Sequence, residues 1–358
     1  MQYGHFDDAR KEYVITRPDT PRAWSNYLGS TEYGAIITNH AGGYSFYKSA
    51  AQGKFTRLIF NALPGDQPGR YFYLRDREDG DYWSASWQPV GKPLEQYRSE
   101  CRHGTAYTVI TSSYSGIETE ATYFVPLDKN YEVWILRIKN ASDRPRRLDV
   151  WSFAELVSEW HTWHDQFNLQ YSQYIVRCEL VDGMIAHAMC PNLPEDPNFE
   201  NRDQSRHAFL ALVGAEATGF DTDRESFIGP YRTYRDPIVV ERGHCMGSEA
   251  MGDNACGVFQ VELALEPGEE REFAVLLGVG RAQVAGRAAR AEVSSVADAR
   301  IMLLRVIKHW HGKLGAIDDL APQAIDSSNT VDGKPVFLST ADSSSESASA
   351  EALMRSRY

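Results

Sequence analysis

The densest group of side chains able to do chemistry runs from residue 160 to residue 165, W-H-T-W-H-D. His161 and His164 are three residues apart, so a helix would bring both imidazoles to one face, where they could ligate a metal. A catalytic zinc needs three protein ligands, and no third ligand follows at metal-binding spacing. The sequence therefore predicts no metal centre here. Two interpretations stay open: a loop that contacts a ligand, or an exposed polar strand.

The residues that follow this group carry amide and phenol side chains, which hydrogen-bond readily to sugar hydroxyls. They include Gln166, Asn168, Gln170 and Tyr171. The chain is also rich in aromatic residues, with 19 Tyr, 15 Phe and 8 Trp, whose rings can stack on the C–H faces of a pyranose. The same residue types are favoured in strands and cores. Composition alone therefore does not separate a sugar site from a packed β domain.

Two other segments carry groups that chemistry could use. F-D-T-D-R-E, at residues 220–225, places Asp221 and Asp223 two residues apart, a spacing compatible with acid–base work but also typical of a solvated loop. Gly42 and Gly43 interrupt a β region, and no G-x-x-x-x-G-K-[ST] or G-x-G-x-x-G pattern surrounds them. This pair predicts a tight turn or a close backbone approach rather than a phosphate loop. No G-x-S-x-G motif marks a nucleophilic serine.

Charge and composition exclude several classes of function. The chain has 358 residues, 37 Lys plus Arg and 49 Asp plus Glu, and a net charge of −12, which argues against binding nucleic acid or anionic membranes. No apolar run approaches the ~20 residues of a membrane-spanning helix, and the first residues do not resemble a secretory signal. Five scattered cysteines without a C-x-x-C pair predict free thiols in a reducing cytoplasm.

The elements that must position these groups are mainly β-strands. Residues 117–123, 133–138, 148–153, 258–265 and 272–278 have strand patterns, and polar or Pro-Gly turns separate them. Many short strands with few helical stretches predict a large antiparallel sandwich over residues 1–280.

The pattern changes after Gly280. Residues 282–311 place apolar side chains on one face of a helix, and Gly312 and Gly315 are stop signals. We expect a linker helix over 281–315 and a poorly ordered, polar tail over 316–358.

A series of short runs has a distinctive order and spacing: Y-G-H-F-D-D (3–8), R-K-E-Y-V-I-T (10–16), P-R-A-W-S-N-Y-L-G (21–29), A-G-G-Y-S-F-Y (41–47), G-D-Y-W-S-A-S-W-Q-P-V (80–90), R-H-G (102–104), Y-F-V-P (123–126), F-D-T-D-R (220–224) and L-E-P-G-E (265–269). Together they resemble the N-terminal region of the glycoside hydrolase family 94 phosphorylases, which include cellobiose, cellobionic acid and N,N′-diacetylchitobiose phosphorylases. The resemblance covers about residues 1–315.

This resemblance implies a β-supersandwich of the galactose-mutarotase type followed by linker helices. It implies inverting phosphorolysis of a β-glucoside, with inorganic phosphate as co-substrate and no other cofactor. The partners implied are a carbohydrate and a second copy in a homodimer. The stretch that matches the family's acceptor loop contains Asp165, Gln166, Asn168, Gln170 and Tyr171. Family members that act on cellobiose have a basic residue where this chain has Tyr171, which argues against a cellobiose acceptor.

The sequence also departs from the family pattern. The family's catalytic Asp lies in a W-N-D motif of a helical barrel, and neither W-N-D nor G-x-R-D-x-x-Q-D occurs here. We therefore expect no catalytic residue in this chain, and a truncated or frame-shifted product that is inactive alone. Two alternatives stay open: a free-standing carbohydrate-binding or assembly module, and a mutarotase-like enzyme that uses a His and a carboxylate.

Overall fold

The computed structural model describes residues 2–59, 67–157, 175–189, 207–324, 330–331 and 334–335. Strands dominate these residues, and every pairing among them is antiparallel, which confirms the predicted mainly β class. The expected strands are present, within longer elements. The chain after β11 and the chain after β18 each pass from one sheet to another, so the predicted neighbouring pairs span the sandwich instead of forming hairpins.

The largest sheet has eleven strands. In spatial order they are β1 (Gly4–Asp7), β2 (Glu12–Ile15), β8 (Arg98–Gly104), β9 (Tyr107–Tyr114), β10 (Ile117–Phe124), β11 (Tyr131–Asn140), β19 (Glu270–Val279), β15 (His207–Val213), β14 (Met184–Met189), β13 (Val176–Val181) and β17 (Ala250–Met251).

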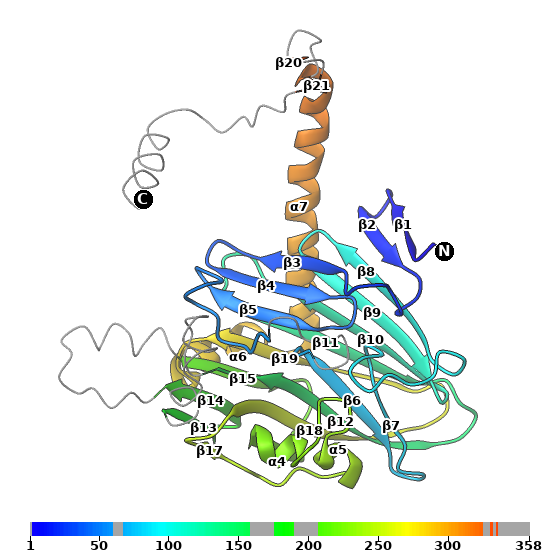
Figure 1. The fold of residues 1–358 in the computed structure, drawn as a ribbon, viewed down its shortest axis with the longest axis vertical. Coiled ribbons are helices and arrows are strands. Elements are labelled where there is room, and N and C mark those ends of the chain that lie inside the picture. The colour runs from blue at the N-terminus through cyan, green and yellow to red at the C-terminus, as the bar shows by residue number, and fades with distance from the viewer. Residues whose placement is uncertain are drawn as a thin grey trace, which may run out of the picture. The chain divides into compact units, whose positions relative to one another are not determined.

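Two smaller sheets contribute to the inner core with the large sheet (Figure 1). The five-stranded sheet contains β16 (Gly219–Asp223), β18 (Ala255–Leu265), β12 (Arg146–Glu155), β6 (Tyr71–Asp76) and β7 (Tyr82–Ser84). The three-stranded sheet contains β3 (Ser25–Gly29), β4 (Tyr33–Thr38) and β5 (Gly43–Tyr47). Short helices α4 (Arg224–Ile228) and α5 (Ile238–Arg242) follow β16.

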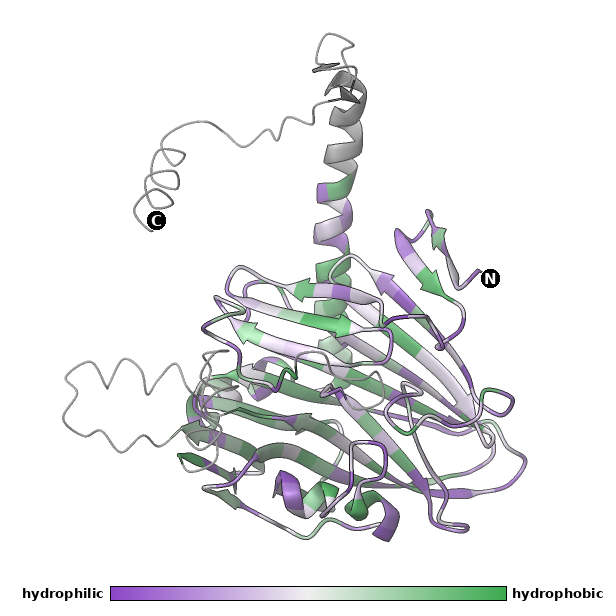
Figure 2. Ribbon diagram, in the orientation of Figure 1, coloured by the Kyte–Doolittle hydropathy of each residue, from purple (hydrophilic) through white to green (hydrophobic). Residues whose placement is uncertain are grey.

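The middle strands of the large sheet are buried on both faces. On β11, Trp134, Leu136 and Ile138 face the inner core between the sheets, whereas Tyr131, Val133 and Ile135 face an outer core. β19 alternates in the same way. Successive side chains of a strand point to opposite faces of the sheet. A strand buried on both faces therefore has a continuous run of apolar residues in its sequence. Figure 2 shows this apolar character along the large sheet.

Helices complete the outer core. The π-helix η2 (Ala282–Gly286), α6 (Arg287–Glu292) and α7 (Val296–Ala324) contribute Ala282, Ala289, Val296, Ala299 and Val306 to it.

A short break separates α6 from α7. The Ser295 hydroxyl accepts a hydrogen bond from the Asp298 backbone N–H at 3.2 Å, and the Asp298 carboxylate accepts one from the Ser295 N–H at 3.0 Å. This reciprocal cap starts a new helix and divides the predicted single helix into segments. Gly312 and Gly315 lie inside α7 rather than ending it.

The chain forms two compact units, Met1–His311 and Gly312–Tyr358. The boundary expected at residue 280 falls between β19 and η2. In the second unit, the structure describes the end of α7 and a pair of two-residue strands, β20 (Thr330–Val331) and β21 (Lys334–Pro335). The rest of the predicted tail lies outside the described residues.

Candidate functional site

The predicted acceptor loop, Asp165, Gln166, Asn168, Gln170 and Tyr171, lies outside the described residues, as do His161 and His164. The structure describes the place where the chain enters this segment. β12 ends at Glu155, and the next residue, Leu156, forms a bridge with Thr56. Two parts of the chain about a hundred residues apart are therefore joined at this point.

A buried carboxylate, that of Glu155, organises this junction. It accepts hydrogen bonds from Arg57 Nε at 3.1 Å, from Arg224 Nε at 2.9 Å and from the Tyr234 hydroxyl. Arg57 also donates to the side-chain oxygen of Asn254 at 3.2 Å. The cluster therefore ties the end of β12 and the segment after β5 to the start of α4 and to the residue just before β18.

Burial and the charge of Glu155 determine the protonation states of Arg224 and Tyr234. Burial alone would lower the pKa of Arg224, but the carboxylate of Glu155 raises it above its usual value. Burial, and then the charge of Glu155, raise the pKa of Tyr234 well above 10. Arg224 stays a cation and Tyr234 a neutral donor over the whole physiological range, so the cluster forms a fixed support instead of a proton-transfer site.

The two aspartates of F-D-T-D-R-E are structural. Asp221 is fully buried and accepts hydrogen bonds from the backbone N–H groups of Met246 and Ser248 at 2.9–3.1 Å. Asp223 caps α4 by accepting from the N–H of Glu225 at 2.9 Å. Both carboxylates therefore hold backbone N–H groups, and the burial of Asp221 departs from the solvated loop that the spacing favoured.

The structure also explains why the second residue of the Gly42–Gly43 pair must be glycine. Gly43 has φ +119°, and a Cβ there would lie 2.1 Å from the Ile36 carbonyl oxygen. Only glycine permits this conformation and this close approach between β4 and β5, as the sequence predicted.

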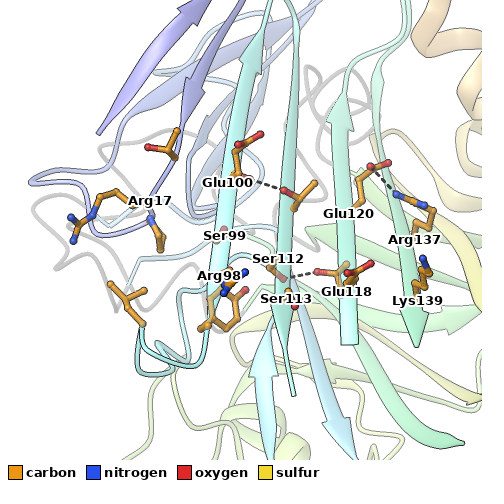
Figure 3. Close-up of a pocket in the computed structure, with 16 residues that line it drawn as sticks. Arg17, Arg98, Ser99, Glu100, Ser112, Ser113, Glu118, Glu120, Arg137 and Lys139 are labelled. Carbon is orange, nitrogen blue, oxygen red and sulfur yellow. Dashed lines mark hydrogen bonds and ion pairs between the residues drawn. The ribbon is translucent and has the colours of Figure 1, made fainter. Parts of the chain in front are cut away.

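A polar groove of about 700 Å³ lies on the large sheet over β8 to β11 (Figure 3). Strand pairing places its residues in two rows across the four strands. One row is Glu100, Thr111, Glu120 and Arg137, and the next is Arg98, Ser113, Glu118 and Lys139. Arg137 pairs with Glu120 at 3.1 Å and with Glu270, on the neighbouring strand β19, at 3.2 Å.

These rows continue the sheet face that η2, α6 and α7 cover elsewhere. The face therefore has an apolar half under the helices and a charged half open to solvent. Its alternating charges compensate one another across neighbouring strands, as in a solvated sheet surface. Within the part of the chain that the structure describes, no group of three His, Cys, Asp or Glu side chains could hold a metal ion. No helix there is long and apolar enough to cross a membrane.

Comparison with known proteins identifies the domain. The sequence profile of the glycosyl hydrolase 94 supersandwich domain matches residues 11–298. The chain belongs to glycosyl hydrolase family 94. The resemblance seen in the sequence is thereby confirmed, and so is the supersandwich fold that it implied.

Relatives in family 94 match most of this chain but are much longer. The N,N′-diacetylchitobiose phosphorylase of Vibrio furnissii is 36% identical over 310 residues, which are 87% of this chain and 37% of the relative. The solabiose phosphorylase of Paenibacillus borealis is 30% identical over 283 residues, which are 77% of this chain and 34% of the relative. The chain thus spans about a third of the length of these family 94 relatives.

Proposed function

We propose that this domain is the supersandwich portion of an inverting disaccharide phosphorylase, that it supplies contacts to the acceptor sugar, and that it does not catalyse phosphorolysis alone. The support for this proposal is the family match, together with relatives that are disaccharide phosphorylases aligned over most of the chain. In such a reaction phosphate attacks the anomeric carbon, and one carboxylic acid protonates the leaving oxygen.

The described carboxylates support the second part of the proposal. A general acid must direct a protonated oxygen towards the substrate. Each buried carboxylate in the described ranges instead accepts hydrogen bonds from protein donors; these residues are Glu12, Asp76, Glu132, Asp149, Glu155 and Asp221. Their oxygens accept hydrogen bonds from arginines, from tyrosines or from backbone N–H groups.

The first part of the proposal assigns the acceptor contacts to Asp165, Gln166, Asn168, Gln170 and Tyr171. Glu155 supports it, because the buried cluster around this residue fixes the point where the chain enters that segment. Rigid anchoring of a binding segment lowers the entropy cost of ordering it on a ligand.

The test is release of inorganic phosphate from α-glucose 1-phosphate and its N-acetylglucosamine analogue, with glucose, gluconate and N-acetylglucosamine as acceptors. We expect no release above the blank by the folded chain, and calorimetric binding of at least one acceptor. The double variant Asn168→Ala/Gln170→Ala should weaken that binding about tenfold or more, as for the loss of about 1.4 kcal/mol. The control Gln52→Ala removes an exposed amide elsewhere and should bind as the wild type does. Acceptor-dependent phosphate release, or binding that the double variant leaves unchanged, would contradict the proposal.

We further propose that the domain forms a homodimer in a reducing compartment. The free thiols of Cys101, Cys178, Cys245 and Cys256 support the compartment. Exposed apolar side chains on the helix layer, Val284, Ile301 and Leu304, support the association. Trp310, further along the same helix, packs partly against the outer core.

The substitution Ile301→Lys/Leu304→Lys is expected to weaken the dimer about tenfold or more, because it places charges in an apolar contact. Light scattering across a concentration series measures this, and Arg305→Ala on the same helix is the control. A monomeric wild type at all concentrations, or an unchanged dimer in the double variant, would refute the association.

A further inference from the structure

The outward face of the three-stranded sheet β3–β5 is an unexplained aromatic surface. Strand pairing puts Tyr27, Ile36 and Tyr44 in one row and Gly29, Gly34 and Phe46 in the next. Alternate residues of the same strands, among them Leu28, Ala35 and Ile37, point into the inner core. Figure 1 shows this sheet in blue beside β8 to β11. Tyr27 is 54% exposed, and Tyr44 and Phe46 are partly exposed.

The two glycines make room for the rings. A Cβ on Gly34 would lie 2.4 Å from Phe46 Cζ and 2.8 Å from the Tyr27 hydroxyl, and a Cβ on Gly29 would lie 2.6 Å from Tyr27 Cε1. Both rings therefore lean over the glycine backbone and cover it. Tyr27 nevertheless stays half exposed and Phe46 partly exposed. The sequence thus stabilises an open aromatic platform instead of filling the space with side chains.

The three rings form a connected strip. The centroids of Tyr27 and Phe46 are 6.4 Å apart and tilted by 52°, and those of Tyr44 and Phe46 are 6.0 Å apart and tilted by 39°. The three rings are thus neighbours that are inclined to one another, and Phe46 lies between Tyr27 and Tyr44.

The face is also uncharged. Its outward residues are Ser25, Tyr27, Gly29, Gly34, Ile36, Thr38, Tyr44 and Phe46, and none can ionise at neutral pH. The nearby Lys48 is turned to Glu32, with an ion pair of 3.4 Å, and to the ring of Tyr47. Such a surface offers nothing to a phosphorylated or acidic ligand, and Ile36 is its one branched aliphatic side chain. It suits a neutral ligand with flat apolar faces and polar edges.

We propose that this aromatic platform, Tyr27, Tyr44 and Phe46, binds a neutral oligosaccharide of β-linked hexopyranoses. In glucopyranose and N-acetylglucosaminopyranose units with β-linkages, the substituents are equatorial, so both faces of each ring present axial C–H groups. These faces stack on aromatic rings, while the equatorial hydroxyls stay hydrated at the rim. The platform is additional to the acceptor contacts proposed above and uses different residues.

Calorimetric titration of the wild-type chain with cellohexaose and with chitohexaose tests the platform. We expect weak binding of at least one oligomer, and an affinity about tenfold lower, as for a loss of about 1.4 kcal/mol, in Tyr27→Ala and in Phe46→Ala. Tyr27→Phe keeps the ring and should retain the affinity. Tyr231→Ala removes a tyrosine that is fully exposed in the connection between α4 and α5, and should also bind as the wild type does.

Two results would overturn the platform. One is the absence of binding of both hexasaccharides to the folded wild type. The other is an affinity that Tyr27→Ala and Phe46→Ala leave unchanged while both variants keep the wild-type melting temperature. Tyr27→Ala is the more informative variant because its side chain is half exposed and not part of the inner core. Loss of monosaccharide acceptor binding in Asn168→Ala/Gln170→Ala with intact hexasaccharide binding would separate the two proposed sites.

Discussion

Lowering the pH from 7.5 to 5 is expected to cost the domain about 4 kcal/mol of its free energy of unfolding, through two buried histidines. Burial, with a smaller contribution from the neighbouring His207, lowers the pKa of His187 from 6.5 to about 3. Burial likewise lowers the pKa of His103 to about 4, against a hydrogen bond to the Trp24 carbonyl. In the unfolded chain both histidines take up protons below about pH 6.5, whereas in the native state they stay neutral. Each therefore costs about 2 kcal/mol at pH 5, and stability falls as the pH falls.

Urea unfolding at the two pH values measures the effect. His187 is the more informative residue, because neither of its ring nitrogens has a hydrogen-bond partner. His187→Leu should remove about half of the pH dependence and should not weaken the domain at pH 7.5, since no hydrogen bond is lost. His244→Leu, at an exposed position, is the control. An unchanged pH dependence in His187→Leu would show that this histidine is not a source of the acid sensitivity.

Glu132→Gln is expected to destabilise the domain by about 3–5 kcal/mol, because it leaves a buried arginine without its counter-charge. Glu132 and Arg70 are both almost completely buried between the sheets, and Arg70 Nε donates to the carboxylate at 2.6 Å. The same carboxylate accepts from Trp134 Nε1 at 2.9 Å and from the Ser45 hydroxyl at 3.1 Å. The substitution therefore disturbs the three-stranded sheet and the large sheet together.

An exposed ion pair serves as a control that distinguishes the effect of burial from the effect of losing an ion pair. Asp182 and Arg287 form an exposed ion pair at 2.9 Å, and Asp182→Asn should change stability by less than about 1 kcal/mol. The double variant Arg70→Met/Glu132→Leu should recover only part of the loss: it removes both charges, but Trp134 Nε1 and the Ser45 hydroxyl lose their acceptor. Equal effects of Glu132→Gln and Asp182→Asn would contradict the assignment of Glu132 as a buried counter-charge.

The strands were readable from the sequence because their side chains alternate or run apolar, and β10 and β12 match those patterns closely. These patterns could not predict which sheet each strand joins. The turn Glu266-Pro267-Gly268-Glu269 predicts that the chain reverses, and it does so while passing from β18 in the five-stranded sheet to β19 in the large one. Local turn chemistry sets the reversal, whereas long-range packing decides the partner.

The functional residues were harder to predict for a similar reason. Side-chain chemistry marked four of the acceptor residues as able to bind sugar hydroxyls, and only the resemblance assigned them to an acceptor loop, so they stay a prediction. The cluster of Arg57, Glu155 and Arg224 joins distant parts of the chain, so no local spacing could indicate it. The aromatic platform did have a local signal. Tyr44 and Phe46 alternate on one strand face, and Gly34 leaves the neighbouring strand bare beneath them.

The helix layer over the outer core has a consequence for recombination among family members. Val296, Ala299 and Val306 of the helix layer share the outer core with Val133 and Leu276 of the sheet. A crossover between two parental genes at the junction after β19 would combine the helix layer of one parent with the large sheet of the other. We expect viable chimaeras to inherit residues 106–311 from one parent, because the helix layer packs against side chains of the sheet from Ala106 onwards.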